Sequence, residues 1–173
     1  MSSIEITRHR DVYPEIHSSV YPREEFAGKV VVVTGGGNGL GKAAGLAFAE
    51  LGSSVAFADI IGEDAESAAN EARQRFGVKT IAIKMDVCSL KDNERLVETV
   101  ERELGPVDCV IFSAVKARWD TIDLSTSEDW WSVMETNLKG PVDLTRLLVP
   151  GMLKRNTGTF IYHASRVRFL LQY

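Results

Sequence analysis

Cysteine and long apolar runs are both scarce in this sequence of 173 residues. The two cysteines, Cys88 and Cys109, are too few for a small domain held together by several disulfides. No apolar run approaches the roughly 18 residues that cross a bilayer. The first 26 residues mix acidic and basic side chains with prolines, unlike a signal or transit peptide. We therefore expect a cytoplasmic protein with two reduced thiols and no membrane partner.

The sequence also has fewer basic than acidic residues. Lysine and arginine number 20 against 24 acidic residues, so the formal net charge is −4 with histidine neutral, and we expect no nucleic-acid partner. Of the three histidines, His9 and His17 show no metal-ligand spacing, and we predict no metal site. Hydrophobic residues make up 45% of the chain and charged residues 25%, which is typical of a globular protein with a buried core.

The apolar patterning predicts an irregular arm over residues 1–26 and one domain over residues 27–173. Short apolar, β-branched runs alternate with amphipathic stretches along that domain. The runs predict strands at 29–34, 54–59, 80–85, 107–113 and 159–163, and the stretches predict helices at 39–51, 63–76, 89–104 and 127–155. We expect the last helix to bend near Gly140-Pro141. This alternation predicts an α/β fold with a doubly wound parallel sheet of the Rossmann type.

The loop between the first predicted strand and helix is rich in glycine, and runs Thr34, Gly35, Gly36, Gly37, Asn38, Gly39, Leu40, Gly41. Glycine permits a tight turn with positive φ and lets the backbone approach a pyrophosphate. The helix that follows offers free N–H groups and a partial positive charge to such an anion. The order of strand, loop, helix and strand predicts a dinucleotide-binding domain, and the alternative is an ordinary turn between a strand and a helix.

Asp59 ends the second predicted strand, 18 residues after Gly41. An acidic residue at this place bonds the adenosine ribose hydroxyls in dinucleotide-binding folds. Its charge repels a 2′-phosphate, so we predict NAD rather than NADP as the cofactor, with Ile60 beside it in the binding site. The alternative is that Asp59 only caps the turn that follows the strand.

The spacing Thr-Gly-x-x-x-Gly-Leu-Gly resembles that of the short-chain dehydrogenase/reductase family, over about residues 28–166. The resemblance implies an oxidoreductase that acts on a small alcohol or ketone, in a biosynthetic role. It implies a sheet order of 3-2-1-4-5. It also implies cofactor contacts from the ends of the third and fourth strands, a proton relay and a catalytic serine. The matching residues are Asp86, Val87, Ser113 and Ala114 for the cofactor, Asn137 for the relay and Ser165 for the serine.

Two segments depart from the family pattern. The fourth strand usually ends in Asn-Asn-Ala-Gly, whereas this chain has Phe112-Ser113-Ala114-Val115, and Val115 is expected to weaken cofactor binding. The sequence ends at Tyr173, before the Tyr-x-x-x-Lys segment of the family, so we expect a C-terminally truncated member with an incomplete catalytic tetrad. The alternatives are a repurposed non-redox enzyme, such as a cyclase or isomerase, and a catalytically impaired nucleotide-binding protein or fragment.

A few further side chains are weaker candidates. His163 and Ser165 lie two apart, which could suggest a hydrolytic pair, but no third orienting residue is evident. Four cations near the predicted strand ends are either surface residues or contacts for an anionic ligand: Lys116, Arg118, Arg166 and Arg168. The fifth strand would be an edge, and the 127–155 helix carries more apolar surface than one face can hide. We therefore predict a homo-oligomer formed through the 127–155 helix and the 159–163 strand.

Overall fold

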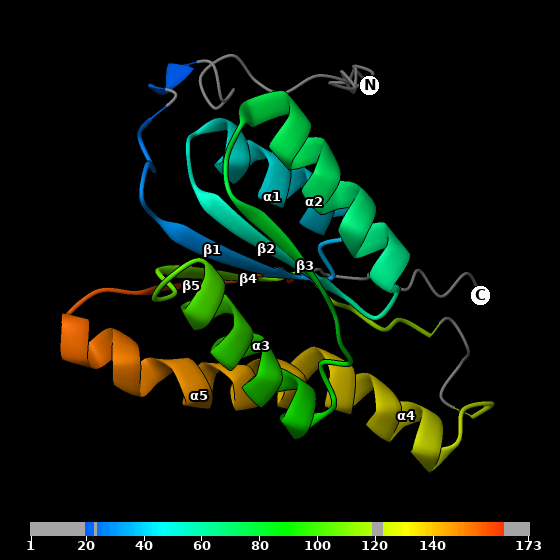
Figure 1. The fold of residues 1–173 in the computed structure, drawn as a ribbon. Helices are drawn as coiled ribbons and strands as arrows, with labels where there is room; N and C mark the ends of the chain where they lie inside the picture. The colour runs from blue at the N-terminus through cyan, green and yellow to red at the C-terminus, as the bar shows by residue number, and fades with distance from the viewer. Residues whose placement is uncertain (1–19, 23, 119–122, 165–173) are drawn as a thin grey trace, which may run out of the picture.

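The computed structural model describes residues 20–22, 24–118 and 123–164, and it contains one five-stranded sheet between two layers of helices (Figure 1). All neighbouring strands are parallel, and their order is β3-β2-β1-β4-β5. The strands are β1 (Val30–Thr34), β2 (Ser54–Asp59), β3 (Thr80–Lys84), β4 (Cys109–Phe112) and β5 (Thr159–Tyr162). The predicted doubly wound sheet of the Rossmann type, with its five strands and their order, is confirmed.

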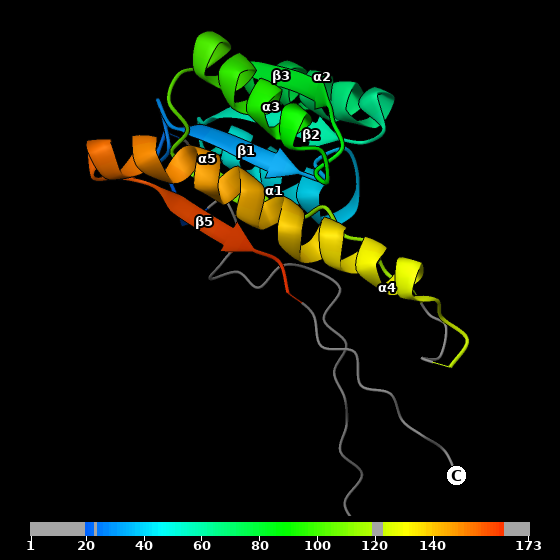
Figure 2. The same cartoon turned by 90° about the horizontal axis from the view of Figure 1, so that it is seen from below.

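The helices cover both faces of the sheet. On one face lie α1 (Gly39–Glu50) and α2 (Gly62–Phe76), and on the other lie α3 (Leu90–Glu103) and α5 (Gly140–Arg155) (Figures 1 and 2). All five residues of β1 are buried. Val31 and Val33 pack in the core beneath α1 and α2, whereas Val30 and Val32 pack in the core beneath α3 and α5. Burial on both faces explains the uninterrupted apolar run of this central strand.

The predicted helix ends are also found where local chemistry places them. Gly77 ends α2 in the left-handed conformation, with φ of 72°. The side chain of Ser89 caps the start of α3 by accepting the backbone N–H of Asp92 at 3.2 Å. These local signals fix where α2 ends and where α3 begins, on either side of β3.

The predicted helix over residues 127–155 has three parts. These are α4 (Ser127–Met134), a π-helical turn η3 (Glu135–Lys139) and α5. In the π-helical turn the N–H of Gly140 donates to the carbonyl of Glu135, five residues earlier. Pro141 has no N–H to give the carbonyl of Asn137, which disfavours a regular α-helix at this point. The irregularity thus lies just before the predicted bend, and π-helical turns are frequent at functional sites.

Strand β5 lies at the edge of the described sheet, beside α5 (Figure 2). At the other end of the described chain, the ring of Phe26 packs edge-on against Phe48 of α1, with 5.2 Å between ring centroids. The predicted division at residues 26 and 27 stays a prediction. Among the described residues, no helix is long and apolar enough to cross a membrane.

Candidate nucleotide-binding site

A pocket of about 570 Å³ opens at the carboxyl ends of the strands. Ligands bind at this end of open parallel sheets, and the volume falls within the roughly 300–1,000 Å³ of small-molecule sites. Several of the predicted cofactor residues line it, namely Gly35, Asp59, Ile60, Asp86, Val87, Ser113 and Ala114. They follow or end β1, β2, β3 and β4, so the topology gathers residues that are far apart in the sequence.

The glycine loop packs too closely for side chains at Gly35, Gly36, Gly37 and Gly41. Gly35 has φ of 65°, and a Cβ atom there would lie 2.6 Å from the backbone nitrogen of Ala114. A Cβ atom on Gly41 would overlap the carbonyl oxygen of Gly35. The loop therefore lies against both the start of α1 and the segment after β4, and Gly35 lines the pocket with backbone alone.

The remaining loop residues shape the start of α1 without lining the pocket. Asn38 caps the helix, and its side chain accepts the N–H of Gly39 at 2.8 Å. The N–H groups of Leu40 and Gly41 lie in the first turn, where a helix offers them no carbonyl partner. Thr34, the last residue of β1, is buried. This helix end presents donors and a partial positive charge, the properties that an anionic group such as a phosphate requires.

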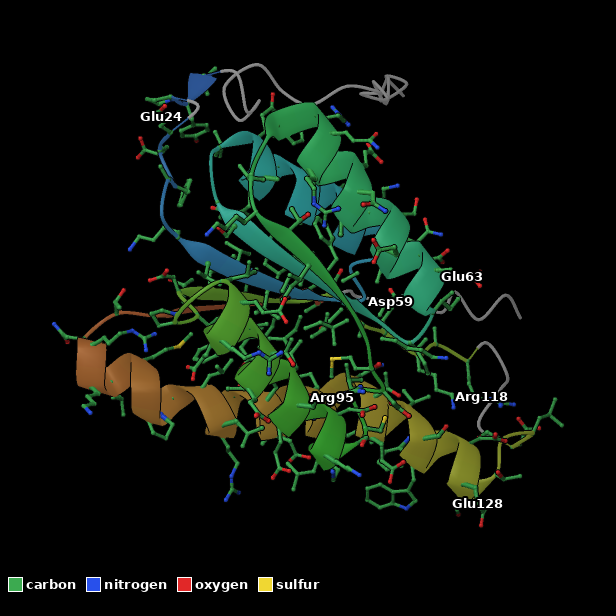
Figure 3. The ribbon with its side chains drawn as sticks, viewed as in Figure 1. Glu24, Asp59, Glu63, Arg95, Arg118 and Glu128 are labelled. Atoms are coloured by element: carbon green, nitrogen blue, oxygen red, sulfur yellow. The ribbon has the colours of Figure 1, made fainter. Side chains whose placement is uncertain are left out.

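Asp59 joins two loops at the end of β2 (Figure 3). Its Oδ2 accepts the N–H of Gly37 at 2.9 Å, and its Oδ1 accepts the N–H of Ile61 at 3.0 Å. The carboxylate thus caps the turn after its strand and also holds the glycine loop. It remains half-buried on the pocket wall, where it can accept further donors.

Asp86 and Val87 form the wall after β3. The Oδ1 atom of Asp86 accepts the N–H of Cys88 at 2.9 Å, and Val87 packs so close to Gly140 that a Cβ atom on the glycine would lie 2.8 Å from the Val87 carbonyl oxygen. The thiol of Cys88 also lines the pocket, 3.4 Å from the hydroxyl of Thr136. Burial raises the pKa of the Cys88 thiol, and the nearby charge of Asp86 raises it further, although the Thr136 hydrogen bond acts in the opposite direction.

The unusual segment at the end of β4, Phe112 to Val115, lies partly in the core and partly on the pocket wall. Phe112 is buried, and its ring stacks on that of Tyr162 with 4.6 Å between centroids. It therefore belongs to the core beneath α3 and α5. Val115 is 73% exposed and lines the pocket. Of the two large apolar residues in this segment, only Val115 stands where it can obstruct a ligand.

Asn137 lies in the π-helical turn and holds the chain after β4 in place. Its Oδ1 accepts the N–H of Lys116 at 2.8 Å, and its Nδ2 donates to the Lys116 carbonyl at 2.9 Å. The side-chain amide of Asn137 thus both accepts a hydrogen bond from and donates one to the backbone of Lys116. The geometry makes Asn137 a clamp between the helix and the pocket wall.

The sequence alone did not single out the helical side of this pocket. Ser132, Glu135 and Thr136 line it from α4 and the π-helical turn. Their i, i+3, i+4 spacing directly before Asn137 is the signal that could have found them. Lys116 also lines the pocket, whereas Arg118 pairs with Asp129 at 2.7 Å.

Some predicted residues cannot be placed. Ser165, Arg166 and Arg168 lie outside the described residues, so their proposed roles stay predictions. His163 is described, and its Nδ1 lies 2.9 Å from the hydroxyl oxygen of Ser113. Within the described parts of the chain, no group of three or more His, Cys, Asp or Glu residues could hold a metal ion.

The described residues fit a dinucleotide. The bare glycine backbone and the start of α1 suit a pyrophosphate. The Asp59 carboxylate can accept hydrogen bonds from ribose hydroxyls, and the apolar side chain of Val87 on the pocket wall suits a flat base.

Comparison with known proteins agrees with this fit. The sequence model described as short chain dehydrogenase matches residues 29–169. A short chain dehydrogenase of Pseudocercospora fijiensis is 34% identical over 160 residues, which cover 91% of this chain and 51% of that protein. The chain spans about half the length of the curated relatives it matches.

Two solved structures share the fold. L-Sorbose reductase from Gluconobacter frateurii, complexed with NADPH and L-sorbose, has a TM-score of 0.76 at 29% identity, covering 80% of this chain and 52% of that chain. A 7α-hydroxysteroid dehydrogenase complexed with NADH and 7-oxo glycochenodeoxycholic acid has a TM-score of 0.75 at 28% identity, with coverage of 80% and 53%. The two complexes contain different nicotinamide cofactors.

Proposed function

Because the chain belongs to the short-chain dehydrogenase/reductase family, we propose that its pocket binds NAD(H) for the oxidation or reduction of a small alcohol or ketone. The single observation that carries this proposal is the placement of Asp59. Its carboxylate lines the pocket beside the backbone of Gly37, where a ribose would meet the glycine loop. The predicted biosynthetic role is part of the same proposal.

The preference for NAD over NADP rests on charge. Asp59 and Asp86 both line the side of the pocket formed by the ends of β2 and β3. A 2′-phosphate bound there would bring negative charge against carboxylates, at a cost that grows as water is excluded. The two ribose hydroxyls of NAD are instead donors that a carboxylate can accept.

The bound nicotinamide would supply or accept the hydride. The chain's own residues would bind and orient it: the start of α1 the pyrophosphate, Asp59 the adenosine ribose, and Asp86 and Val87 the base. Asn137 would keep the wall at Lys116 fixed. By resemblance, Ser165 would contact the substrate oxygen.

The test separates binding from turnover. Fluorescence titration with NADH should give saturable binding, and NADPH should bind more weakly. Turnover of an alcohol panel with NAD should be lost in Ser165→Ala, while NADH binding is retained. If neither nucleotide shows saturable binding, the proposal is wrong; if NADH binds and no alcohol is oxidised, cofactor binding stands and the oxidoreductase assignment fails.

Val115 favours a second candidate function. A branched side chain on the pocket wall alters the space next to Ser113 and Ala114. The pocket could then serve a non-redox cyclase or isomerase, or a nucleotide-binding protein without catalysis. Product formation without any change in cofactor absorbance would identify the first of these.

The homo-oligomer is also a proposal. Trp130 and Trp131 of α4 touch edge to face at 4.9 Å, and Trp131 is 60% exposed. Leu138 and Val142 extend this exposed apolar strip along the same helical segment. Burial of such a strip against a second copy would stabilise both chains.

A further inference from the structure

His163 joins the ends of two neighbouring strands. It directly follows β5, and its N–H donates to the carbonyl of Phe112 at 3.1 Å as the last backbone bond between β4 and β5. Its imidazole then reaches across to Ser113, with 2.9 Å between Nδ1 and the hydroxyl oxygen. The two residues are 50 positions apart, so the parallel register of the strands creates this contact.

Ser113 stands where the glycine loop meets the sheet. Its N–H donates to the carbonyl of Thr34 at 3.0 Å, which ties it to the end of β1. A Cβ atom on Gly41 would lie 3.1 Å from the Ser113 Cβ, and a Cβ atom on Gly35 would lie 2.8 Å from the Ser113 carbonyl carbon. Any displacement of Ser113 therefore changes the packing of the loop.

We propose that His163 is a positioning residue for the cofactor site, acting through Ser113. His163 itself is not among the pocket-lining residues, whereas Ser113 and Ala114 are. Its hydrogen bond fixes the Ser113 side chain in one direction and holds the Ser113–Ala114 segment against the glycine loop. This inference rests on the proposed binding of NAD(H), and it goes beyond it by adding a residue that touches no cofactor.

The contact lies at the end of the backbone ladder between β4 and β5. Strand β4 has four residues and β5 forms the edge of the described sheet, so the backbone ladder ends at His163. A side-chain bond just beyond the last backbone bond adds a second link between the ends of β4 and β5. One hydrogen bond contributes about 0.5–1.5 kcal/mol net, which corresponds to roughly a 2- to 12-fold change in an equilibrium.

The experiment compares variants of the full chain by NADH titration. His163→Ala should weaken NADH binding by about 3- to 10-fold. His163→Asn should restore most of it, since its amide can reach the same hydroxyl from a similar position. Tyr162→Phe is the matched control: it removes the Tyr162 hydroxyl that bonds Thr145 of α5 at 2.8 Å, away from Ser113, and should leave the affinity unchanged.

Amide exchange gives a readout that does not depend on the cofactor. The Ser113 amide should exchange about 3- to 10-fold faster in His163→Ala than in the wild type, and near the wild-type rate in His163→Asn. Unchanged affinity and unchanged exchange in His163→Ala would overturn the inference. Absence of NADH binding in the wild type would overturn the proposed function, and the exchange rates would still decide the role of His163.

Discussion

The carboxylate of Asp59 and the backbone N–H of Gly37 form a 2.9 Å hydrogen bond across 22 positions of sequence. This bond joins the end of β2 to the glycine loop that opens α1. A Cβ atom on Gly37 would lie 3.0 Å from the same carboxylate oxygen, so the loop approaches the acid closely. The relationship places the pocket-lining carboxylate directly beside the backbone of the glycine loop.

The first prediction concerns cofactor choice. Asp59→Asn removes the charge while keeping an oxygen that can accept the Gly37 N–H. Because hydrogen bonds to charged groups are worth about 1.5–3 kcal/mol, the affinity for NADH should fall by roughly tenfold or more. NADPH should lose less, since the repulsion of its 2′-phosphate is relieved. Fluorescence titration with both nucleotides measures the ratio of the two affinities.

Glu63→Gln provides the control for this variant. Glu63 is an exposed carboxylate in the first turn of α2 (Figure 3), close in sequence to Asp59. It is not among the residues that line the pocket. It should leave the ratio of affinities unchanged. An equal ratio in the wild type and Asp59→Asn would contradict the assigned role of Asp59.

The second prediction compares two helical glycines. Gly41→Ala should destabilise the fold by about 1–3 kcal/mol and abolish nucleotide binding, because the new Cβ overlaps the Gly35 carbonyl. Gly151→Ala in α5 should stabilise the fold by about 0.5–1 kcal/mol, since its Cβ would meet only the Arg155 side chain at 3.4 Å. Urea unfolding measures both, and equal effects would show that the loop tolerates a side chain at residue 41.

The third prediction concerns thiol reactivity. The thiolate is the form that is alkylated. Burial raises the pKa of the Cys88 thiol, and burial raises the pKa of the Cys109 thiol to about 11. Iodoacetamide should therefore modify both slowly at neutral pH, and the rate at Cys88 should rise at a higher pH than for a free cysteine.

Bound nucleotide provides the control for the thiol experiment. NADH should slow the modification of Cys88, which lines the pocket, and should leave the buried Cys109 unaffected. Mass spectrometry of the alkylated peptides distinguishes the two sites. Modification of Cys88 at the same rate with and without saturating NADH would mean that the nucleotide binds elsewhere.

The fourth prediction concerns the Asn137 clamp. Asn137→Ala removes two hydrogen bonds to Lys116 and should lower the free energy of unfolding by about 1–2 kcal/mol. The Lys116 amide should also lose its protection from hydrogen exchange. Lys139→Gln, in the same π-helical turn, breaks only an exposed pair with Asp143 and should change neither measurement. Equal stability of both variants would show that the clamp contributes nothing.

The fifth prediction concerns assembly. Light scattering coupled to size exclusion should give a mass above that of one 19.1 kDa chain at low micromolar concentration. Trp131→Glu should shift the protein toward the monomer because it places a charge in the exposed apolar strip. A wild-type protein that is monomeric under these conditions would contradict the proposed homo-oligomer.

Much of the fold could be predicted because each element carries a local signal. The run Val30–Val33 is apolar at every position, which is typical of a strand with two covered faces. Ser89 and Gly77 mark helix ends through side-chain capping and positive φ. The proximity of the glycine loop and Asp59 could also be predicted, because parallel strands place their carboxyl ends at one edge of the sheet.

The remaining features depend on tertiary contacts. The sequence could not show to which face of the sheet Phe112 points. Both faces of β4 are buried, so its residues do not alternate between apolar and polar. The contact between Ser113 and His163 requires the register of β4 and β5. The π-helical turn places Asn137 opposite Lys116, and Pro141 alone indicates only that a regular helix is disfavoured there.

A crystal structure of the chain with NADH tests the central claim most directly. The adenosine ribose hydroxyls should lie within hydrogen-bond distance of the Asp59 carboxylate, with the pyrophosphate against the start of α1. The base should lie near Asp86 and Val87. A nucleotide found outside this pocket, or inside it with the ribose away from Asp59, would contradict the account.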